Sequence, residues 1–437
     1  MSHQNTTEEK RETAILVGVD YVTHNQTGLS LDDSLDELEM LADTAGIDVA
    51  GNLCQKLDSP NPRTYLGTGK VEELKVLAEE LGAGVVIFDD ELSPRHQREL
   101  EKELGREIKV IDRTALILDI FAQHASTREG MLQVEMAQLQ YRLPRLTRAW
   151  THLARQSGGA AGRSGSVGGV GLRGPGEQQL EVDRREIKSK INKLKDALEK
   201  VREHRSRHRD LRRKTNIPVV ALVGYTNAGK STLLNRLTDA SIYVADQLFA
   251  TLDPTTRQLQ LPSGQEVLLT DTVGFIQKLP TQLIAAFRAT LEEISEADLL
   301  MHIVDISHAN AEAQRLSVLE TLNEIGAVSI PVLTVYNKID LLDAVELTDL
   351  KQHHQPGSLY ISAKNGQGVE ELLTAISTEI LKGFTRVDAL VPYDQGQLIS
   401  MFHEKGKVES VVHLEKGIRI KGLLPTQIVS YFKRYLK

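Results

Sequence analysis

A glycine-rich motif near the middle of the chain has the residues needed to bind phosphate groups. Gly224-x4-Gly229-Lys230-Ser231 follows the apolar run VVALV and precedes an amphipathic helical pattern. Backbone N–H groups of such a loop, at the start of a helix, surround phosphate oxygens. We expect Lys230 to reach the β- and γ-phosphates of a nucleotide and the Ser231 hydroxyl to bind Mg²⁺. The required order of strand, loop and helix is present.

A second motif supplies groups for the metal and for the γ-phosphate. The apolar run VLLT leads into Asp271-x-x-Gly274. The carboxylate of Asp271 can hold the metal's ligand shell, and the N–H of Gly274 can meet the γ-phosphate. Between the two motifs lies LFATLDPTTR, residues 248–257, where a GTPase needs a mobile threonine. Spacing alone does not choose between the candidates Thr251, Thr255 and Thr256.

Two further motifs have the chemistry that recognises guanine. Asn337-Lys338-Ile339-Asp340 follows the apolar run VLTVY. The Asp340 carboxylate can accept hydrogen bonds from guanine N1–H and N2–H₂, donors that adenine lacks, so this motif selects GTP over ATP. We expect the Lys338 stem to lie over the base and Asn337 to tie the loop down. The stretch 362–364, Ser-Ala-Lys, ends another predicted strand and offers a backbone N–H to guanine O6.

The residue after Gly274 is Phe275, at a position where many GTPases have a glutamine that orients the attacking water. A phenyl ring cannot hydrogen-bond a water molecule. We therefore expect slow intrinsic hydrolysis, with the missing function supplied by another group or by a partner. A simpler interpretation, compatible with the first, is that Phe275 packs under the segment that contains it.

Composition restricts the class of protein. A chain of 437 residues, 41% of them hydrophobic, can form two to four domains with packed cores. It has no apolar run that could span a bilayer, no signal peptide at its start, and a single cysteine, Cys54. We expect a soluble cytoplasmic protein, monomeric and without a disulfide framework.

Positive charge is concentrated in one segment. Residues 142–214 contain 20 lysines and arginines and eight acidic residues, a balance of +12 in a chain whose net charge is −8. Such a segment indicates a polyanionic partner, and the acidic remainder argues against indiscriminate binding. A solvated helix face is the simpler alternative. Within this segment, nine of the 21 residues 157–177 are glycines, too many to bury a core.

Helical patterns flank these glycine-rich residues. Apolar residues recur at spacings of four and three over 132–153 and again over 180–201. The two seams predict coiled-coil-like helices that pack as an antiparallel hairpin, with the glycine-rich residues at its tip. The first helix, residues 132–156, would be about 37 Å long. Pro144 lies inside it and predicts a kink.

The remaining segments alternate strand and helix patterns, which predicts an α/β fold class. The predicted domains are an N-terminal α/β domain at 1–126, the helical hairpin at 127–214 with its tip at 157–177, a P-loop GTPase domain at 215–382, and a small C-terminal α+β domain at 383–437.

The chain resembles the HflX GTPases, which belong to the translation-factor-related class. The resemblance covers nearly the whole chain and rests on YLGTGKVEEL, GVGLRGPGEQQLEVDRR, LFATLDPTTR and DTVGFIQKLP. It implies a ribosome-associated GTPase that binds the large (50S) ribosomal subunit, which stimulates hydrolysis. Some members split stalled ribosomes under heat or other stress. The resemblance also places the hairpin tip on ribosomal RNA near the peptidyl-transferase centre, and the second Mg²⁺ ligand at Thr251.

The expected site residues follow from the motifs and from this resemblance. The expected GTP contacts are Gly224, Tyr225, Thr226, Asn227, Ala228, Gly229, Lys230, Ser231, Phe249, Ala250, Thr251, Leu252, Asp253, Asp271, Thr272, Val273, Gly274, Asn337, Lys338, Ile339, Asp340, Ser362, Ala363 and Lys364. The expected catalytic residues are Lys230, Thr251 and Gly274. The expected Mg²⁺ ligands are Ser231 and Thr251. Asp271 is expected to hold the ligand shell without binding the ion directly. The expected RNA contacts are Arg163 and Arg173.

Other interpretations are considered beside this one. A GTP-dependent ribosome assembly or RNA-modification factor would need a further catalytic constellation outside residues 216–382, and the sequence shows none. A nucleotide-regulated scaffold without enzymatic activity is suggested by Phe275. The stretch 66–70, LGTGK, resembles a phosphate loop but lacks the full spacing. We expect it to form a tight turn that opens a helix rather than an ATP site.

Overall fold

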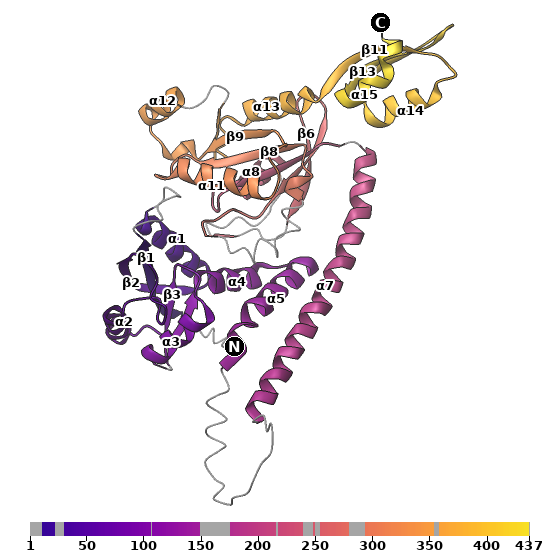
Figure 1. Cartoon of the computed structure of the whole chain (residues 1–437). Helices are drawn as coiled ribbons and strands as arrows, with labels where there is room; N and C mark the ends of the chain where they lie inside the picture. Colours follow the sequence, from indigo (N-terminus) through magenta and orange to yellow (C-terminus); the bar gives the residue numbers. More distant parts are fainter. Residues whose placement is uncertain are drawn as a thin grey trace, which may run out of the picture. The chain divides into compact units, whose positions relative to one another are not determined.

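The structure, a computed structural model, describes residues 11–21, 30–105, 107–148, 175–215, 217–238, 248–249, 254–278, 293–353 and 358–436 (Figure 1). Contacts divide the chain into two units. The first unit comprises Met1–Lys200, Gln247–Phe249 and Gln277–Arg288, and the second comprises Val201–Asp246, Ala250–Ile276 and Ala289–Lys437. No helix among the described residues is long and apolar enough to cross a membrane.

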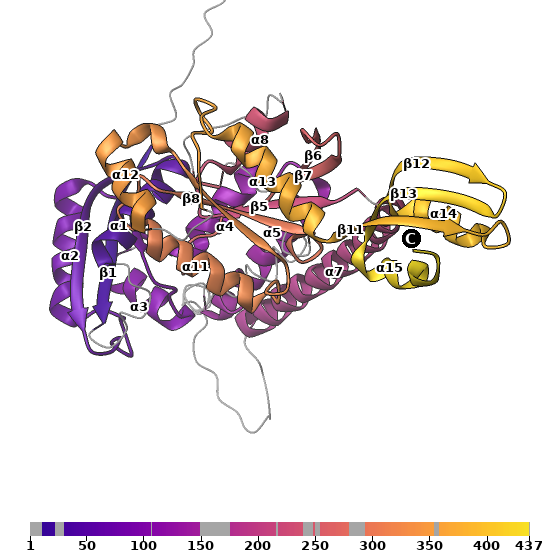
Figure 2. The same cartoon turned by 90° about the horizontal axis from the view of Figure 1, so that it is seen from above.

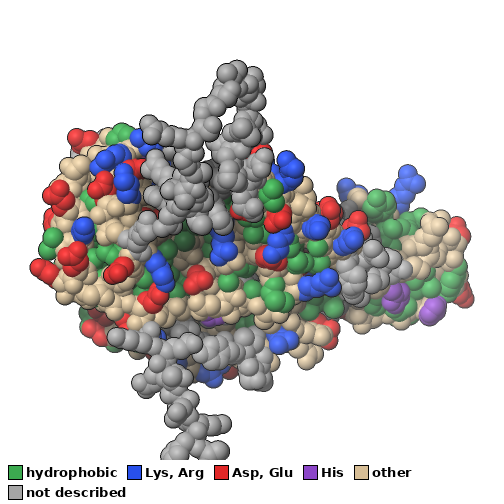
Figure 3. Space-filling model, turned by 90° about the horizontal axis from the view of Figure 1, so that it is seen from below, with side chains coloured by type: hydrophobic (Ala, Val, Ile, Leu, Met, Phe, Trp, Pro, Cys, Tyr) green, Lys and Arg blue, Asp and Glu red, His purple; other side chains and the backbone are tan. Residues whose placement is uncertain are grey.

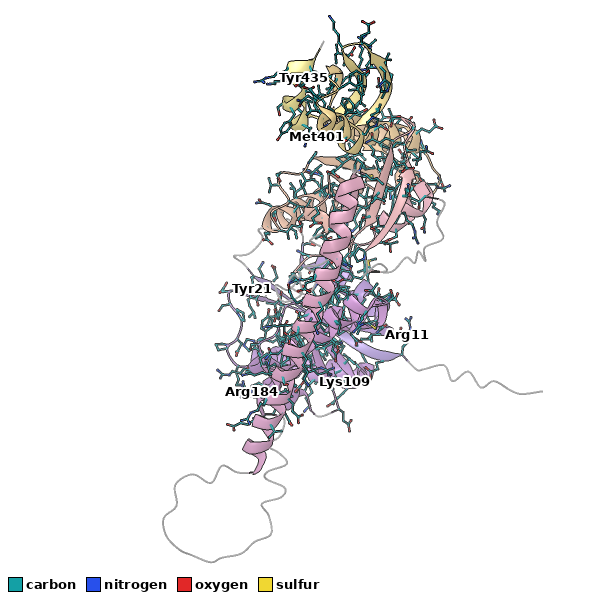
Figure 4. The ribbon with its side chains drawn as sticks, turned by 90° about the vertical axis from the view of Figure 1, so that its right-hand side faces the viewer. Arg11, Tyr21, Lys109, Arg184, Met401 and Tyr435 are labelled. Atoms are coloured by element: carbon teal, nitrogen blue, oxygen red, sulfur yellow. The ribbon has the colours of Figure 1, made fainter. Side chains whose placement is uncertain are left out.

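The first unit contains a four-stranded parallel sheet in the order β2-β1-β3-β4. The strands are β1 (Glu12–Tyr21), β2 (Ile47–Leu57), β3 (Val85–Phe88) and β4 (Lys109–Asp112). Figure 4 labels Arg11 and Tyr21 at opposite ends of β1. All four residues of β3 are buried, as expected of a strand that is covered on both faces.

Helices cover both faces of this sheet. They are α1 (Leu31–Thr44), α2 (Thr68–Leu81), α3 (Pro94–Leu104) and α4 (Arg113–His124). Buried residues of α2 and α3 pack with Ile15 and Val17 in one cluster, while α1 and α4 contact the sheet and each other. Helix α1 starts with a capping box between Ser30 and Asp33, and α2 starts directly after Gly67. The stretch LGTGK therefore opens a helix, as expected.

A buried charged group lies between α1, β3 and α4. The Arg113 guanidinium donates to Asp89 at 2.6 Å and to Glu37 at 2.7 Å, and its side chain is only 2% exposed. The Asp89 side chain is fully buried. Burial raises the pKa of Asp89, but the positive charges of Arg113 and Lys278 outweigh it and lower that pKa below its usual value. The carboxylate is therefore charged inside the core.

The predicted hairpin segment forms α5 (Arg128–Arg142), a short 3-10 helix η1 (Arg145–Arg148) and α7 (Pro175–Thr215). On α7, the predicted seam residues Ile191, Leu194 and Leu198 are buried. An ion pair of 2.6 Å joins Lys190 of α7 to Glu135 of α5. Of the predicted tip, residues 157–174 lie outside the described residues and residues 175–177 begin α7, so the hairpin stays a prediction.

The expectation of one kinked helix over 132–156 is wrong in its described part. Helix α5 ends at Arg142, and the chain continues in the tighter 3-10 form after Pro144. Leu143 still has helical dihedral angles, φ −52° and ψ −48°. Pro144 has no N–H for the helical ladder, and its ring crowds the carbonyl four residues earlier, so the α-helix stops rather than bends. The buried hydrophobic residues of α5 are Val134, Ala137 and Tyr141, which lie one or two positions from the predicted seam residues.

The second unit contains a six-stranded sheet in the order β10-β9-β8-β5-β7-β6. Its strands are β5 (Val219–Gly224), β6 (Thr255–Gln260), β7 (Glu266–Asp271), β8 (Leu299–Asp305), β9 (Val332–Asn337) and β10 (Leu359–Tyr360). Only β6 runs antiparallel to its neighbour among these pairings. Parallel strands present their carboxyl ends at one edge, where ligands bind in open α/β sheets. The predicted α/β class is confirmed.

Helices also cover both faces of the second sheet. They are α8 (Lys230–Thr238), α11 (Ala311–Glu324), α12 (Ala344–His353) and α13 (Val369–Lys382). Along β5, Val220 and Leu222 pack with residues of α8 and α13, whereas Ala221 and Val223 pack with residues of α11. The strand is therefore apolar on both faces, which explains its unbroken hydrophobic run.

The last residues form a three-stranded antiparallel sheet in the order β11-β13-β12. The elements are β11 (Phe384–Val391), α14 (Gly396–Lys405), β12 (Lys407–Leu414), β13 (Gly417–Pro425) and α15 (Thr426–Phe432). The helices lie on one face of the sheet, around buried Phe402 and Phe432 (Figure 2). Figure 4 labels Met401 and Tyr435 in this part of the chain.

Replacing Arg113 with alanine should destabilise the first unit. The change leaves Asp89 charged inside the core without its principal partner, which costs about 3 to 5 kcal/mol. Hydrogen exchange of the β3 amides in the full chain measures the loss as faster exchange. Lys109→Ala is the control, because Lys109 pairs with Glu12 where both side chains are more than half exposed. Equal exchange in the two variants would contradict the assignment of Arg113 as the buried anchor.

Candidate functional site

The phosphate loop joins β5 to α8 in the second unit. Lys230 is the first residue of α8, and its side chain turns back along the loop. Its ammonium donates to the carbonyl of Gly224 at 3.1 Å and to the carbonyl of Tyr225 at 2.7 Å. These bonds hold a long side chain in one position, only 6% exposed, at the amino end of the helix. A phosphate bound there would meet both the ammonium and backbone N–H groups of the first turn.

The Asn337 side chain connects the phosphate loop to the guanine-binding loops. Its Nδ2 donates to the Ala228 carbonyl at 2.9 Å, and its Oδ1 accepts from the Ala363 N–H at 2.9 Å. Gly229 has φ +92°, and a Cβ there would lie 2.2 Å from Asn337 Nδ2. The glycine is therefore required both by its backbone conformation and by the amide that passes it. As expected from the sequence, the asparagine ties the loops together.

Oxygen ligands suitable for Mg²⁺ lie at the start of α8 and the end of β7. The Ser231 hydroxyl donates to Asp271 Oδ2 at 2.6 Å, and Asp271 is fully buried. A hydroxyl and a carboxylate are hard oxygen donors, the type that Mg²⁺ prefers. Next to them, the Thr272 hydroxyl donates to the Leu222 carbonyl at 2.6 Å and fixes the end of β7 against β5. The donor set fits the metal that the motifs imply.

The guanine-binding residues lie at the carboxyl ends of β9 and β10. Asp340 Oδ1 accepts a hydrogen bond of 2.6 Å from the Ser362 hydroxyl, which orients the carboxylate. Lys338 adopts a left-handed backbone conformation, φ +66°, and its ammonium pairs with Asp305 at 2.7 Å. The ion pair holds the lysine side chain in place at the end of β9. Its contact with a base stays a prediction.

Phe275 is packed into the core beside the phosphate loop. Its side chain is 6% exposed and belongs to the cluster that contains Ile294 and Leu300. Its backbone is tied to the loop, because the Phe275 N–H donates to Gly224 at 3.0 Å and the Thr226 N–H donates to Phe275 at 2.8 Å. The packing interpretation of Phe275 holds, and this side chain supplies no group to a water molecule.

The structure does not test some of the expected site residues. Ala250, Thr251, Leu252 and Asp253 lie outside the described residues, as do Arg163 and Arg173. Phe249 belongs to the first unit, where its ring packs edge-on against Phe121 with centroids 4.6 Å apart. Its role as a nucleotide contact stays a prediction.

Two residues of the site, and one residue of the first unit, were not anticipated from the sequence. Arg236 of α8 donates to the carbonyls of Ala363 and Lys364 and so supports the loop that offers an N–H to guanine O6. Asp305, at the end of β8, fixes Lys338. Lys278, four residues after Gly274, forms ion pairs within the first unit. The only sequence signal for Asp305 is its place after a buried strand, and Arg236 has none beyond its place on α8.

Comparison with known proteins agrees with the geometry of the site. Residues 32–122 match the family model described as GTP-binding GTPase N-terminal, and residues 124–212 match GTP-binding GTPase Middle Region. Residues 219–338, which include the phosphate loop and end at Lys338, match the model described as 50S ribosome-binding GTPase. The three matches leave few residues between 32 and 338 uncovered.

Curated relatives are similar over almost the full length. A protein of Caldanaerobacter subterraneus subsp. tengcongensis, named GTPase HflX, is 46% identical and covers 98% of this chain and 94% of its own length. GTPase HflX of Escherichia coli is 44% identical, covering 93% of this chain and 92% of its own. A solved GTP-binding protein from Sulfolobus solfataricus in complex with GDP is 26% identical, with a TM-score of 0.43, over 85% of this chain and 99% of that chain.

Nucleotide affinity should depend on the charge of Lys230. Burial lowers the pKa of this ammonium to about 8, and the nearby Asp271 carboxylate offsets the effect only in part. Bound phosphates favour the charged form and raise the pKa, so binding takes up a proton above pH 8. GDP affinity should be constant below roughly pH 8 and then fall, by at most about tenfold per pH unit. Calorimetry in two buffers of different ionisation enthalpy measures both effects. Affinity that stays flat to roughly pH 9 without proton uptake would contradict this prediction.

Asp340→Asn should exchange guanine for xanthine preference. The amide replaces one carboxylate acceptor by a donor, which no longer matches guanine N1–H and N2–H₂ but matches the second carbonyl of xanthine. We expect GDP affinity to fall by about 10- to 100-fold and xanthosine diphosphate affinity to rise, since a lost paired donor costs about 1.5 to 3 kcal/mol. Fluorescence titration with both nucleotides measures the change. Asp343→Asn is the matched control, and the same loss in that variant would refute the assignment.

Proposed function

Since the chain belongs to the HflX GTPase family, as its motifs predict, and therefore hydrolyses GTP, we propose that it binds the large ribosomal subunit. In this proposal it separates or rescues ribosomes under stress, in a GTP-dependent way. The observation that carries the proposal is the match of residues 219–338 to the model described as 50S ribosome-binding GTPase. The basic segment 142–214 supports it, because a ribosome is a polyanion.

The nucleotide site supports a Mg²⁺-dependent reaction. Ser231 and Thr251 would bind the ion, and Asp271 would hold Ser231 through the 2.6 Å hydrogen bond. The ion, when bound, neutralises charge on the β- and γ-phosphates. Lys230 contacts the same phosphates, and the Gly274 N–H contacts the γ-phosphate. The ion, Lys230 and the Gly274 N–H would position the phosphates. None of them orients the attacking water, so another group must do so.

A partner is the best candidate for that source. Phe275 has its side chain in the core and its backbone tied to the phosphate loop, so no group at this position can reach a water. A GTPase that lacks such a group hydrolyses slowly until a partner completes the site. We propose that the large subunit is this partner, which would restrict hydrolysis to the ribosome-bound protein.

The helix α7 would provide part of the RNA contact. Its exposed basic residues over the described side chains include Arg184, Arg185, Lys188, Lys193, Lys195 and Lys200. Figure 4 labels Arg184 on this helix, and Figure 3 shows basic and acidic side chains interspersed on one face of the molecule. Lysines and arginines on such a helix bind phosphates without reading sequence, so affinity should depend on salt.

The large subunit should stimulate hydrolysis. We expect slow GTP turnover in the protein alone and a rise of at least about 100-fold when purified 50S subunits are added, the scale of one correctly placed charge-stabilising group. Phosphate release with 50S subunits, 30S subunits and no addition measures the effect, with 30S subunits as the control. Turnover that is fast alone and unchanged by 50S subunits would refute the role of the partner.

The glycine-rich tip should be needed on the ribosome but not for folding. Replacing Gly158–Gly174 by a short turn removes little buried area, so folding and basal GTPase activity should be unchanged. Arg163→Glu with Arg173→Glu should weaken 50S association and lower the salt slope by roughly one unit per lost phosphate contact. Sedimentation at several salt concentrations measures both. Normal binding and activity without the tip would make these residues a linker.

An assembly or RNA-modification factor is the second candidate, because the same motifs and basic segment would serve it. The two functions differ in the particle that they recognise. Sedimentation of the protein with a non-hydrolysable GTP analogue separates them. Conversion of 70S ribosomes to subunits supports the first function, whereas binding restricted to immature 50S particles supports the second.

A further inference from the structure

The segment that follows Gly274 is held in the first unit by a lysine. Gln277–Arg288 groups with that unit, although Gly274 and Phe275 belong to the second. The ammonium of Lys278 pairs with Asp89 and, at 2.7 Å, with Asp90. These two carboxylates follow β3, at the carboxyl edge of the first sheet. A single side chain four residues after Gly274 therefore pairs with the carboxyl edge of the first sheet, within the first unit.

The anchor is part of a longer chain of hydrogen bonds. Asp90 accepts from the Tyr65 hydroxyl at 2.7 Å, and Tyr65 accepts from the Tyr21 hydroxyl at 2.7 Å. On its other side, Asp89 is held by Arg113 and by the Ser34 hydroxyl at 2.8 Å. Other hydrogen bonds therefore hold both carboxylates that accept from Lys278. This distinguishes the contact from an ion pair between two mobile surface side chains.

Two residues of this hydrogen-bond network, Lys278 and Tyr65, have strained backbone conformations. Lys278 has φ +54° and Tyr65 has φ +67°, in the left-handed region that side chains with a Cβ rarely adopt. Such conformations cost free energy and persist only where other interactions determine them, often at sites that switch between states. The ion pairs of Lys278 and the hydrogen bonds of Tyr65 are the interactions that can stabilise these two conformations.

The near end of the same segment lies against the phosphate loop. A Cβ at Gly274 would be 2.8 Å from Thr226 Cα and 2.9 Å from the Lys230 ammonium. A γ-phosphate that accepts from both the Gly274 N–H and this ammonium would therefore enter beside a packed contact. GDP has no γ-phosphate and places no group there.

We propose that Lys278 is a positioning residue whose ion pairs with Asp89 and Asp90 hold the segment in the GDP-compatible arrangement, so that binding of the γ-phosphate works against them. The nucleotide state is thereby coupled to the carboxyl edge of the first sheet. A ligand shifts such an equilibrium only by its different affinity for the two arrangements, and here the ion pairs contribute to that difference. The inference concerns the GTPase reaction itself and does not depend on which particle the protein binds.

Lys278→Met tests the proposal in the full chain. Methionine keeps the length of the side chain without its charge, and Asp89 keeps Arg113 as a partner, so the fold should survive. We expect the affinity for a non-hydrolysable GTP analogue to rise by about fivefold while GDP affinity stays the same, the scale of a partly exposed ion pair. Lys382→Met is the matched control, because Lys382 pairs with Glu379 on the exposed face of α13. Calorimetric titration with each nucleotide gives the ratio.

Hydrogen exchange provides a second measurement that a purely structural role would not change. The Asp89 N–H donates to the Val17 carbonyl at 2.9 Å and so reports on the carboxyl edge of the sheet. In the wild type, the GTP analogue should increase its exchange relative to GDP, and in Lys278→Met the two nucleotides should give the same rate. An unchanged ratio of affinities, or an equal change for both nucleotides, would overturn the proposal. Exchange at Asp89 that does not respond to nucleotide in the wild type would do so as well.

Discussion

The nucleotide site depends on one buried amide. The Asn337 side chain donates to the phosphate loop at Ala228 and accepts from the guanine-binding loop at Ala363, each at 2.9 Å. The loops follow three different strands, and only their carboxyl ends bring them to one edge. A hydrogen-bonded amide in a core without water is strong and is costly to break. The distance between the phosphate and base positions is therefore set by this side chain, with Gly229 leaving room for it.

Much of the second unit could be predicted because its chemistry is local in sequence. The loop from Gly224 to Ser231 lies between a strand and a helix, and the structure has β5 and α8 at those places. Asp271 and Asn337 each end a buried strand, which the apolar runs before them indicate. The α/β class and the family follow from such patterns. The burial of Phe275 was one of two compatible interpretations of its sequence position, since a large apolar residue next to a strand end is usually buried.

Contacts over long sequence separations could not be predicted. Lys278 is 189 residues from Asp89, and no periodicity connects them. The same is true of Phe249 and Phe121, which pack together in the first unit. The end of α5 at Arg142 is a different failure. The seam pattern continues past Pro144, but the α-helical backbone does not, because a proline lacks the N–H and its ring crowds the carbonyl four residues earlier. The spacing of apolar residues indicates which face of a helix is buried, whereas the backbone geometry at Pro144 determines where the helix ends.

The burial of Asp89 has a consequence for how this protein can change over generations. Its carboxylate is shared between Arg113 inside the core and Lys278 in the segment after Gly274. If the acid is replaced first, a buried guanidinium loses its partner, and if the arginine is replaced first, a buried acid loses its own. Each order passes through a destabilised intermediate. Substitutions at these positions are therefore expected to be epistatic, with neutral replacements accepted together or after the stability of the first unit has increased elsewhere.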